Sequence, residues 1–272
     1  KETILSAINE TVEMIKGGMP VPTDKRITIE EWEEYIILHT HFGSLTNRAL
    51  AQLLGHLITE RTGYTVATQH DPYRILIQSV GDVRAKSIIR IIDEIKDSPP
   101  GYIREALTRA CVRTGIFKRR LIHVARRFGA LKKNVDLSSV SLQSLIRSFE
   151  GTVIYEEALK EVFTKDLDLK GLIRVFQRIS DGDISIVQLK VDGQPSPLAH
   201  LGIEKVSMKT DLIPPEKMKR ILLESARARL LNETRTFICV SCWDYIESIR
   251  IDDLPLKPKC PRCGSNRLGM LR

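Results

Sequence analysis

Four cysteines near the carboxy-terminal end are the residues whose type and spacing point most directly to chemistry. They form two CxxC pairs, Cys239 with Cys242 and Cys260 with Cys263, and 17 residues separate the pairs. Each CxxC turn places two thiolates on one side of a tetrahedral ion, and the intervening loop brings the second pair opposite. The spacing therefore predicts a zinc site, and four thiolates predict a structural ion because no coordination position stays open. The alternative is two disulfides, but nothing in the sequence points to an oxidising compartment.

The residues that follow each cysteine pair predict two different turns. Gly264 directly after the second pair suits a tight knuckle, whereas Trp243 after the first pair predicts a less regular one. The remaining cysteine, Cys111, lies in a predicted helix, where we expect a small buried hydrophobic residue. Small basic zinc modules of this kind bind nucleic acid or protein, and the spacing does not decide between the two.

Positive charge is concentrated in two parts of the 272-residue chain, which carries 42 Lys and Arg against 34 Asp and Glu. Residues 104–133 hold ten basic side chains against the single acid Glu105, and residues 205–272 hold fourteen against eight. The other two segments are acidic, with 11 basic against 14 acidic side chains in 1–103 and 7 against 11 in 134–204. A local excess of this kind is typical of surfaces that bind polyanions.

The 104–133 segment is predicted to form two short helices that break near Thr114 and Gly115. In the second helix Leu121, Val124, Ala125 and Phe128 share one face, so this face is expected to pack on the protein. Arginines flank that stripe, and their guanidinium groups are well shaped to hold phosphates. The alternative is a solvated face paired with acids of the flanking segments. The predicted nucleic-acid-binding residues are Arg109, Arg113, Lys118, Arg119, Arg120, His123, Arg126, Arg127, Lys132 and Lys133, with Trp32 as a base-stacking candidate.

The remaining pattern predicts an α+β fold: a small antiparallel sheet with a helical cluster, followed by a four-cysteine zinc-ribbon-like module. An amphipathic helix begins at the first residues and ends at Gly17 and Gly18, and a helix capped by Ser44 runs to Thr62. A hairpin is predicted around His70-Asp-Pro-Tyr73. Further helices are predicted at 84–96, 100–113, 116–131, 138–148, 151–163, 168–180 and 214–232, with a strand at 184–191. The predicted domains are 1–193, a linker at 194–210, and a helix with the zinc module at 211–272.

Motifs for catalysis are missing from this sequence. It contains no phosphate loop, no GxGxxG, no HExxH and no GxSxG, so no catalytic residue is predicted. His39 and His41 have no third ligand nearby and are expected to be structural hydrogen-bonding residues. The acidic run from Glu30 to Glu34 is expected at a turn or solvated edge. No uncharged apolar run approaches the ~18 residues of a membrane span and no signal peptide is evident, so we expect a cytoplasmic protein without a membrane partner.

Several longer motifs resemble one known family. They are His39-Thr-His-Phe-Gly43 followed by Asn47, Asp71-Pro-Tyr-Arg74, the stretch from Phe117 to Gly129, Pro195-Ser-Pro-Leu198 and the four-cysteine tail. Together they are similar to the region that follows the motor in Lhr-type (large helicase-related) superfamily 2 helicases, and the last two resemble archaeal members in particular. The resemblance runs over nearly the whole chain.

The resemblance implies an accessory nucleic-acid-binding domain of an ATP-dependent 3′-to-5′ translocase that unwinds DNA and RNA:DNA duplexes. It implies single-stranded DNA or RNA and RNA:DNA hybrids as partners, together with the motor domains of the same polypeptide. ATP and Mg²⁺ would belong to that motor, because this chain has no ATPase motif and is not expected to be catalytic by itself. The first residue is Lys1 and not Met, which fits a piece of a longer polypeptide; tag removal or processing is the alternative.

Two other functions stay open from the sequence. Carboxy-terminal parts of some Lhr-type proteins are linked to excision of uracil or damaged bases in DNA repair, which needs a carboxylate in a pocket for a flipped base. Asp71 is a candidate for that carboxylate, although no diagnostic pair is present. The third possibility is a zinc-bearing module that docks protein partners.

Overall fold

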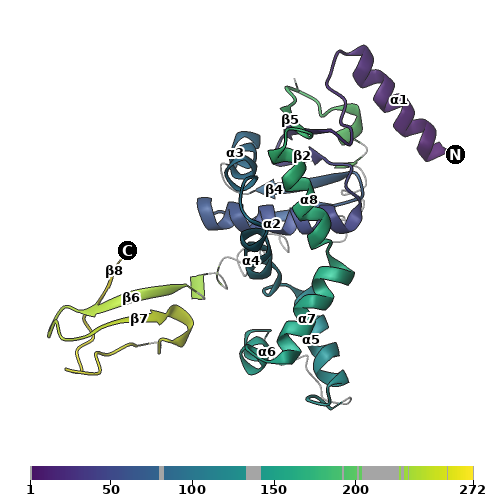
Figure 1. Cartoon of the computed structure of the whole chain (residues 1–272). Coiled ribbons are helices and arrows are strands. Elements are labelled where there is room, and N and C mark those ends of the chain that lie inside the picture. The colour runs from purple at the N-terminus through teal and green to yellow at the C-terminus, as the bar shows by residue number, and fades with distance from the viewer. Residues whose placement is uncertain are drawn as a thin grey trace. The chain divides into compact units, whose positions relative to one another are not determined.

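The computed structural model describes residues 2–79, 83–132, 142–191, 193–200, 202–203, 227, 230–231, 233–255 and 257–271. The chain divides into two compact units, Lys1–Asp211 and Leu212–Arg272 (Figure 1). Each unit has its own sheet, and the predicted α+β class is confirmed.

The sheet of the first unit has five strands in the order β3-β4-β2-β1-β5. Neighbouring strands are antiparallel, except that β5 runs parallel to β1. The predicted hairpin around Asp71 is confirmed, and a second hairpin turns at Glu33, which has a positive φ of 50°. The strands are β1 (Arg26–Trp32), β2 (Tyr35–His39), β3 (Val66–His70), β4 (Arg74–Ser79) and β5 (Ser185–Gln188).

Helices α2 and α3 pack on this sheet, and α5, α6 and α7 gather at one end of the unit (Figure 1). The helix bounds are α1 (Glu2–Lys16), α2 (Ser44–Thr62), α3 (Ala85–Ile95), α4 (Pro100–Cys111), α5 (Gly115–Arg127), α6 (Leu142–Phe149), α7 (Val153–Glu161) and α8 (Leu169–Ser180), with a π-helix, η1 (Val162–Asp166), after α7. None of the helices described combines the length and apolar composition that a membrane crossing requires.

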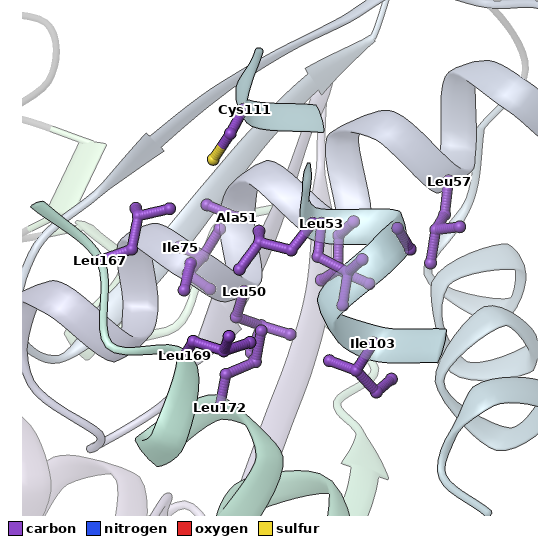
Figure 2. Packing of buried hydrophobic residues seen from close by; sticks show 14 of the residues in the cluster. Leu50, Ala51, Leu53, Leu57, Ile75, Ile103, Cys111, Leu167, Leu169 and Leu172 are labelled. Carbon is purple, nitrogen blue, oxygen red and sulfur yellow. The ribbon is translucent and has the colours of Figure 1, made fainter. Parts of the chain in front are cut away.

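The core of the first unit is organised around α2, which packs against β3, β4, α3, α4 and α8. Figure 2 shows Leu50, Leu53 and Leu57 of α2 beside Ile103 of α4 and Leu172 of α8. All of these side chains are buried in one continuous cluster. Since apolar burial contributes about 25 cal/mol for each Å² removed from water, this cluster is the main stabilising element of the unit.

The second unit contains a three-stranded antiparallel sheet in the order β7-β6-β8. Its strands are β6 (Thr234–Cys239), β7 (Ile246–Arg250) and β8 (Leu268–Leu271), and a 3₁₀ turn, η2 (Ile251–Asp253), follows β7. The sequence did not predict these strands, because the short segments between the cysteines show little alternation of apolar and polar residues. Most of the predicted helix 214–232 lies outside the described residues.

Two expectations about helix ends are corrected by the structure. Gly43, and not Ser44, is the cap residue of α2. Phe128 lies just beyond α5 and is exposed instead of packing with Leu121, because the helix ends at Arg127 and the chain turns away.

Two expectations about burial also change. Residues 194–200, predicted as the start of a linker, pack on the first unit, where Ser196 and Ala199 are buried. Ser196 is held there by hydrogen bonds to Glu30. The predicted apolar stripe of α1 is mostly open to solvent, although Met14 from the same helix is buried.

The acidic run from Glu30 to Glu34 divides between turn and core. Glu33 and Glu34 lie at the exposed hairpin turn, as expected, but Glu30 is completely buried, which makes the expectation for it wrong. His39 Nε2 donates to Glu30 Oε1 at 2.7 Å, and the Ser196 hydroxyl donates to the same oxygen at 2.6 Å. Burial alone would raise the pKa of Glu30, but the bonds from His39 and Ser196 outweigh it and lower that pKa. The expectation that His39 is a structural hydrogen-bonding residue is confirmed.

Prediction: Glu30→Gln should lower the free energy of unfolding of the first unit by about 3 kcal/mol, because it leaves His39 and Ser196 facing a neutral amide in the core. The pKa of Glu30 is lower in the folded chain than in the unfolded chain. Its contribution to the free energy of unfolding is therefore full above the ordinary carboxyl pKa and is lost as the pH falls through the pKa of the folded chain. Urea unfolding at several pH values measures both effects. The exposed-turn variant Glu34→Gln serves as the control, and equal destabilisation of the two variants would contradict a stabilising role for Glu30.

Candidate nucleic-acid interface and metal centre

The four predicted cysteine ligands come together in the second unit. Their sulfur atoms all lie within 4.8 Å of one another. Cys239 Sγ and Cys263 Sγ are 3.6 Å apart, and Cys242 Sγ and Cys260 Sγ are 3.7 Å apart. A tetrahedral ion with metal–sulfur bonds of about 2.3 Å requires sulfur atoms about 3.8 Å apart. The cluster therefore has the donor set and the spacing to hold one metal ion.

The two CxxC knuckles have the same backbone geometry, so the expected irregularity of the first is wrong. The N–H of Trp243 donates to the Cys239 carbonyl at 2.9 Å, and the N–H of Gly264 donates to the Cys260 carbonyl at 2.9 Å. Both residues have positive φ, 60° for Trp243 and 71° for Gly264. A tryptophan thus occupies a backbone conformation that favours glycine.

Hydrogen bonding and burial separate the pKa values of the cysteines. Backbone N–H groups of Cys242 and Ser241 donate to the Cys239 sulfur and lower its pKa to about 6. An N–H from Asp244 favours the Cys242 thiolate, but burial and the neighbouring cysteine sulfurs outweigh it and raise the pKa of Cys242 to about 12. Burial raises the pKa of Cys111 to about 12. The expectation that Cys111 is a small buried hydrophobic residue is confirmed.

The basic segment forms α4 and α5, as predicted. The Thr114 hydroxyl accepts the N–H of Phe117 and caps α5. Phe117, Leu121 and Val124 are fully buried against the body of the unit, where α5 packs on α7. This packing fixes which basic side chains of α5 face the protein and which face solvent.

Two carboxylates next to α5 engage part of its positive charge. Arg120 donates two hydrogen bonds to Asp166, Nε to Oδ2 at 2.5 Å and Nη2 to Oδ1 at 3.0 Å. Arg127 donates to Glu161 at 2.7 Å, and Lys165 Nζ lies 3.3 Å from the same Glu161 carboxylate. The hydrogen bond from Arg120 lowers the pKa of Asp166, and that from Arg127 lowers the pKa of Glu161. The acidic flanking segment therefore supplies partners for the basic helix, which was the alternative interpretation for these arginines.

The predicted nucleic-acid-binding residues consequently fall into groups. Arg120 and Arg127 face the carboxylates of Glu161 and Asp166. Lys118 and Arg126 are half-buried, and Lys133 lies outside the described residues. Five residues of the set are exposed to solvent and donate no hydrogen bond to Glu161 or Asp166. They are Arg109, Arg113, Arg119, His123 and Lys132. Arg119 lies 3.8 Å from Asp166 but its side chain is 61% exposed, so this contact leaves most of the guanidinium open.

Trp32, the predicted stacking residue, lies at the end of β1 against the protein. Its ring stacks on Tyr35, with centroids 6.4 Å apart and planes inclined by 13°. It is half-buried next to Ile37, Leu76 and Ala199. These contacts fill a small second cluster on the sheet and occupy one face of the indole.

Asn47 and Asp71, two residues of the motifs described above, hold α2 and the β3–β4 hairpin together. Asn47 Nδ2 donates to the carbonyl of Asp71 at 2.8 Å, and the Thr40 hydroxyl donates to Asn47 Oδ1 at 2.9 Å. Asp71 Oδ1 accepts the N–H groups of Tyr73 and Arg74 at 2.7 and 2.9 Å, and its Oδ2 pairs with Arg74 Nε at 2.9 Å. Both oxygens of Asp71 are thus engaged in shaping the turn, which gives no support to its candidacy as a base-excision carboxylate.

Comparison with known proteins identifies the family. A family model described as DEAD/H associated matches residues 21–199, which is more than half of the chain. The chain belongs to this family. The resemblance to the accessory region of Lhr-type helicases is confirmed by the following similarities.

The curated relatives are ATP-dependent helicases. Lhr-Core of Sulfolobus acidocaldarius is 26% identical over 78% of this chain and 25% of its own length. Lhr-Core of Methanothermobacter thermautotrophicus is 25% identical over 66% of this chain and 22% of its own length. Among solved structures, Mycobacterium smegmatis helicase Lhr bound to ssDNA and AMP-PNP matches 67% of this chain and 24% of its own chain. The TM-score is 0.54 at 21% identity, which shows a shared fold. The chain spans about a quarter of the length of these proteins.

Prediction: Asp166→Asn should lower the free energy of unfolding of the first unit by about 2 kcal/mol, because it removes the charge that holds the partly buried Arg120. The matched control is Asp183→Asn. Asp183 accepts from Arg178 at 2.6 Å in a far more exposed pair, so this substitution should destabilise the unit less. Urea denaturation compares the two variants. A smaller effect for Asp166→Asn than for Asp183→Asn would show that the acidic cluster, Glu161 with Asp166, does not anchor α5.

Proposed function

We propose that this chain is the accessory region of an Lhr-type ATP-dependent helicase and holds single-stranded nucleic acid on the α4–α5 surface, formed by Arg109, Arg113, Arg119 and His123. The observation that carries the proposal is the division of the arginines in this segment. Glu161 and Asp166 accept hydrogen bonds from Arg127 and Arg120. Arg109, Arg113 and His123 are exposed to solvent, and so is most of Arg119, which lies 3.8 Å from Asp166. The ssDNA bound in the Mycobacterium smegmatis helicase Lhr supports the choice of ligand.

This surface suits a protein that must move along a strand. Contacts from arginine to phosphate carry no sequence information, so the bound strand can shift without a change of affinity. A strand held in this way stays close to the motor without stalling it. Strand guidance, 3′-to-5′ polarity and duplex unwinding are proposed for the whole protein, and RNA:DNA hybrids are included among its substrates. ATP and Mg²⁺ would be bound by the motor domains of the same polypeptide.

The four thiolates of the second unit hold one zinc ion in this proposal. Cys239, Cys242, Cys260 and Cys263 would supply all four ligands, so zinc would fix the two knuckles and take no part in chemistry. The sulfur atoms approach one another across the knuckles, Cys239 toward Cys263 and Cys242 toward Cys260. Because the unit has few buried apolar residues among those described, metal binding would supply much of its folding free energy.

Prediction: the purified chain should contain one zinc per molecule, measured by atomic emission. Cys260→Ser should lose the metal, whereas Cys111→Ala should keep it, because Cys111 belongs to the core of the first unit. After chelation, hydrogen exchange should accelerate in β6, β7 and β8 and stay slow in α2. Unchanged protection of the three strands in a metal-free sample would contradict a structural ion.

Prediction: the double variant Arg113→Gln/Arg119→Gln should weaken binding of an oligothymidylate about tenfold and flatten its salt dependence. The slope of log K against log salt should fall by about 0.7 for each phosphate of a single strand that the variant no longer neutralises. Fluorescence anisotropy at several salt concentrations measures both quantities.

The matched control for this experiment is Lys86→Gln/Arg90→Gln. It removes the same charge from exposed positions of α3, a helix at a different part of the unit. Equally reduced affinity in the two double variants would mean that only net charge matters. An unchanged affinity and slope in Arg113→Gln/Arg119→Gln would exclude the α4–α5 surface as the binding surface.

A further inference from the structure

Trp243 combines an unfavourable backbone with an exposed side chain. Its φ is 60°, in the left-handed region that bulky residues rarely adopt. The residue is 66% exposed. The equivalent position of the other knuckle carries Gly264 with φ 71°, which shows that glycine meets the same geometric requirement. The backbone turn therefore does not explain why this position holds a tryptophan.

Packing does not explain this tryptophan either. Among the described residues of the second unit, no aromatic contact or side-chain hydrogen bond involves its indole, and it belongs to neither hydrophobic cluster of the chain. Trp32, in contrast, stacks on Tyr35 and packs on the sheet. Strained residues that persist without a structural reason are concentrated at binding and catalytic sites.

The two knuckles lie side by side in the second unit. Ser241 Oγ of the first and Ser265 Oγ of the second are 2.8 Å apart. The N–H of Val240 donates to the Arg267 carbonyl at 3.0 Å. Trp243 directly follows Cys242, whose sulfur lies 3.7 Å from that of Cys260 in the second pair.

The second knuckle is strongly basic. The segment 257–267 contains no acid, and its four basic residues are exposed: Lys257, Lys259, Arg262 and Arg267. No ion pair is formed by these four among the described residues of the unit, whereas Arg235 pairs with Glu233 and Arg250 with Asp253. The charge of this knuckle is thus open to an anionic ligand.

We propose that Trp243 is a base-stacking contact for single-stranded nucleic acid, with the basic residues of the second knuckle holding the adjacent phosphates. An indole offers a flat face to any base, so this contact is as independent of sequence as the phosphate contacts. The four basic side chains complement a phosphate backbone, and they favour nucleic acid over a protein partner as the occupant. The inference shares its ligand class with the proposed function but rests on the other unit of the chain.

Substitution of Trp243 should change the affinity for nucleic acid without lowering the stability of the second unit. Trp243→Gly replaces the strained residue by the one found in the second knuckle, so the unfolding midpoint of the second unit should be unchanged or higher. The same variant should bind an oligothymidylate about 5- to 100-fold more weakly, which is the usual effect of removing one base–aromatic stack. Trp243→Phe retains an aromatic face and should keep most of the affinity.

The experiment uses the full chain loaded with zinc. Unlabelled oligothymidylate or oligouridylate is titrated in, and tryptophan emission is recorded for the wild type and for Trp243→Gly. Subtracting the two signals isolates Trp243, because Trp32 is the only other tryptophan. Saturable quenching of the difference signal is the expected result. A Trp32→Phe variant, checked for folding by circular dichroism, should show the same quenching directly.

The outcomes distinguish this inference from the proposed function. If anisotropy reports binding but the Trp243 signal does not change, the inference is overturned and the α4–α5 surface stands. If quenching persists and Arg113→Gln/Arg119→Gln has no effect on affinity, the inference stands and the α4–α5 surface is excluded. If Trp243→Gly lowers the unfolding midpoint and leaves the affinity unchanged, Trp243 is a structural residue and the inference is overturned.

Discussion

The charge of α5 is balanced on one side by Glu161 and Asp166, and the function proposed for this chain depends on that balance. A stretch with ten basic side chains and one acid repels itself, and its helices need outside partners to pack. The end of α7 and the π-helix η1 supply two carboxylates, and both have lowered pKa values because arginines donate to them. A π-helix is rare and often lies at functional positions; here it places Asp166 against Arg120. The partly buried pairs fix the helix, and the α4–α5 surface keeps its exposed positive charge.

The residues that carry the family resemblance act mainly on the scaffold. Asn47 links α2 to Thr40 at the end of β2 and to Asp71 in the β3–β4 turn. Asp71 shapes that turn, and Arg74 reaches the carbonyl of Leu198. Arg48 of α2 connects the sheet to the π-helix, since it donates to His70 on β3 and to the carbonyl of Asp166 on η1. These polar contacts hold the scaffold of the first unit together. They do not by themselves locate the ligand.

Local signals in the sequence predicted much of this structure. The end of α2 at Thr62, the Asp71 hairpin and the approach of the two CxxC pairs each follow from a few residues, and all three are confirmed. The burial of Glu30 depends on contacts that no local pattern contains, because its partner Ser196 lies 166 residues away.

The same reason explains what remained open about the basic helices. Arg120 and Asp166 are 46 residues apart, so charge counting located the helices but could not tell which arginines would be engaged by carboxylates. The positive φ of Trp243 could not be predicted for a different reason, since its side-chain type favours the opposite backbone conformation.

Photo-crosslinking to a single strand that contains 4-thiothymidine, followed by mass spectrometry, tests the central claim most directly because it reports the contacted residues themselves. The predicted result is crosslinked peptides that carry Arg113, Arg119 or His123, and their disappearance at high salt as the hold on phosphate weakens. Crosslinks confined to α3 or to the sheet of the first unit, with none on the α4–α5 surface, would contradict the claim that the acidic cluster leaves this surface free to hold the strand.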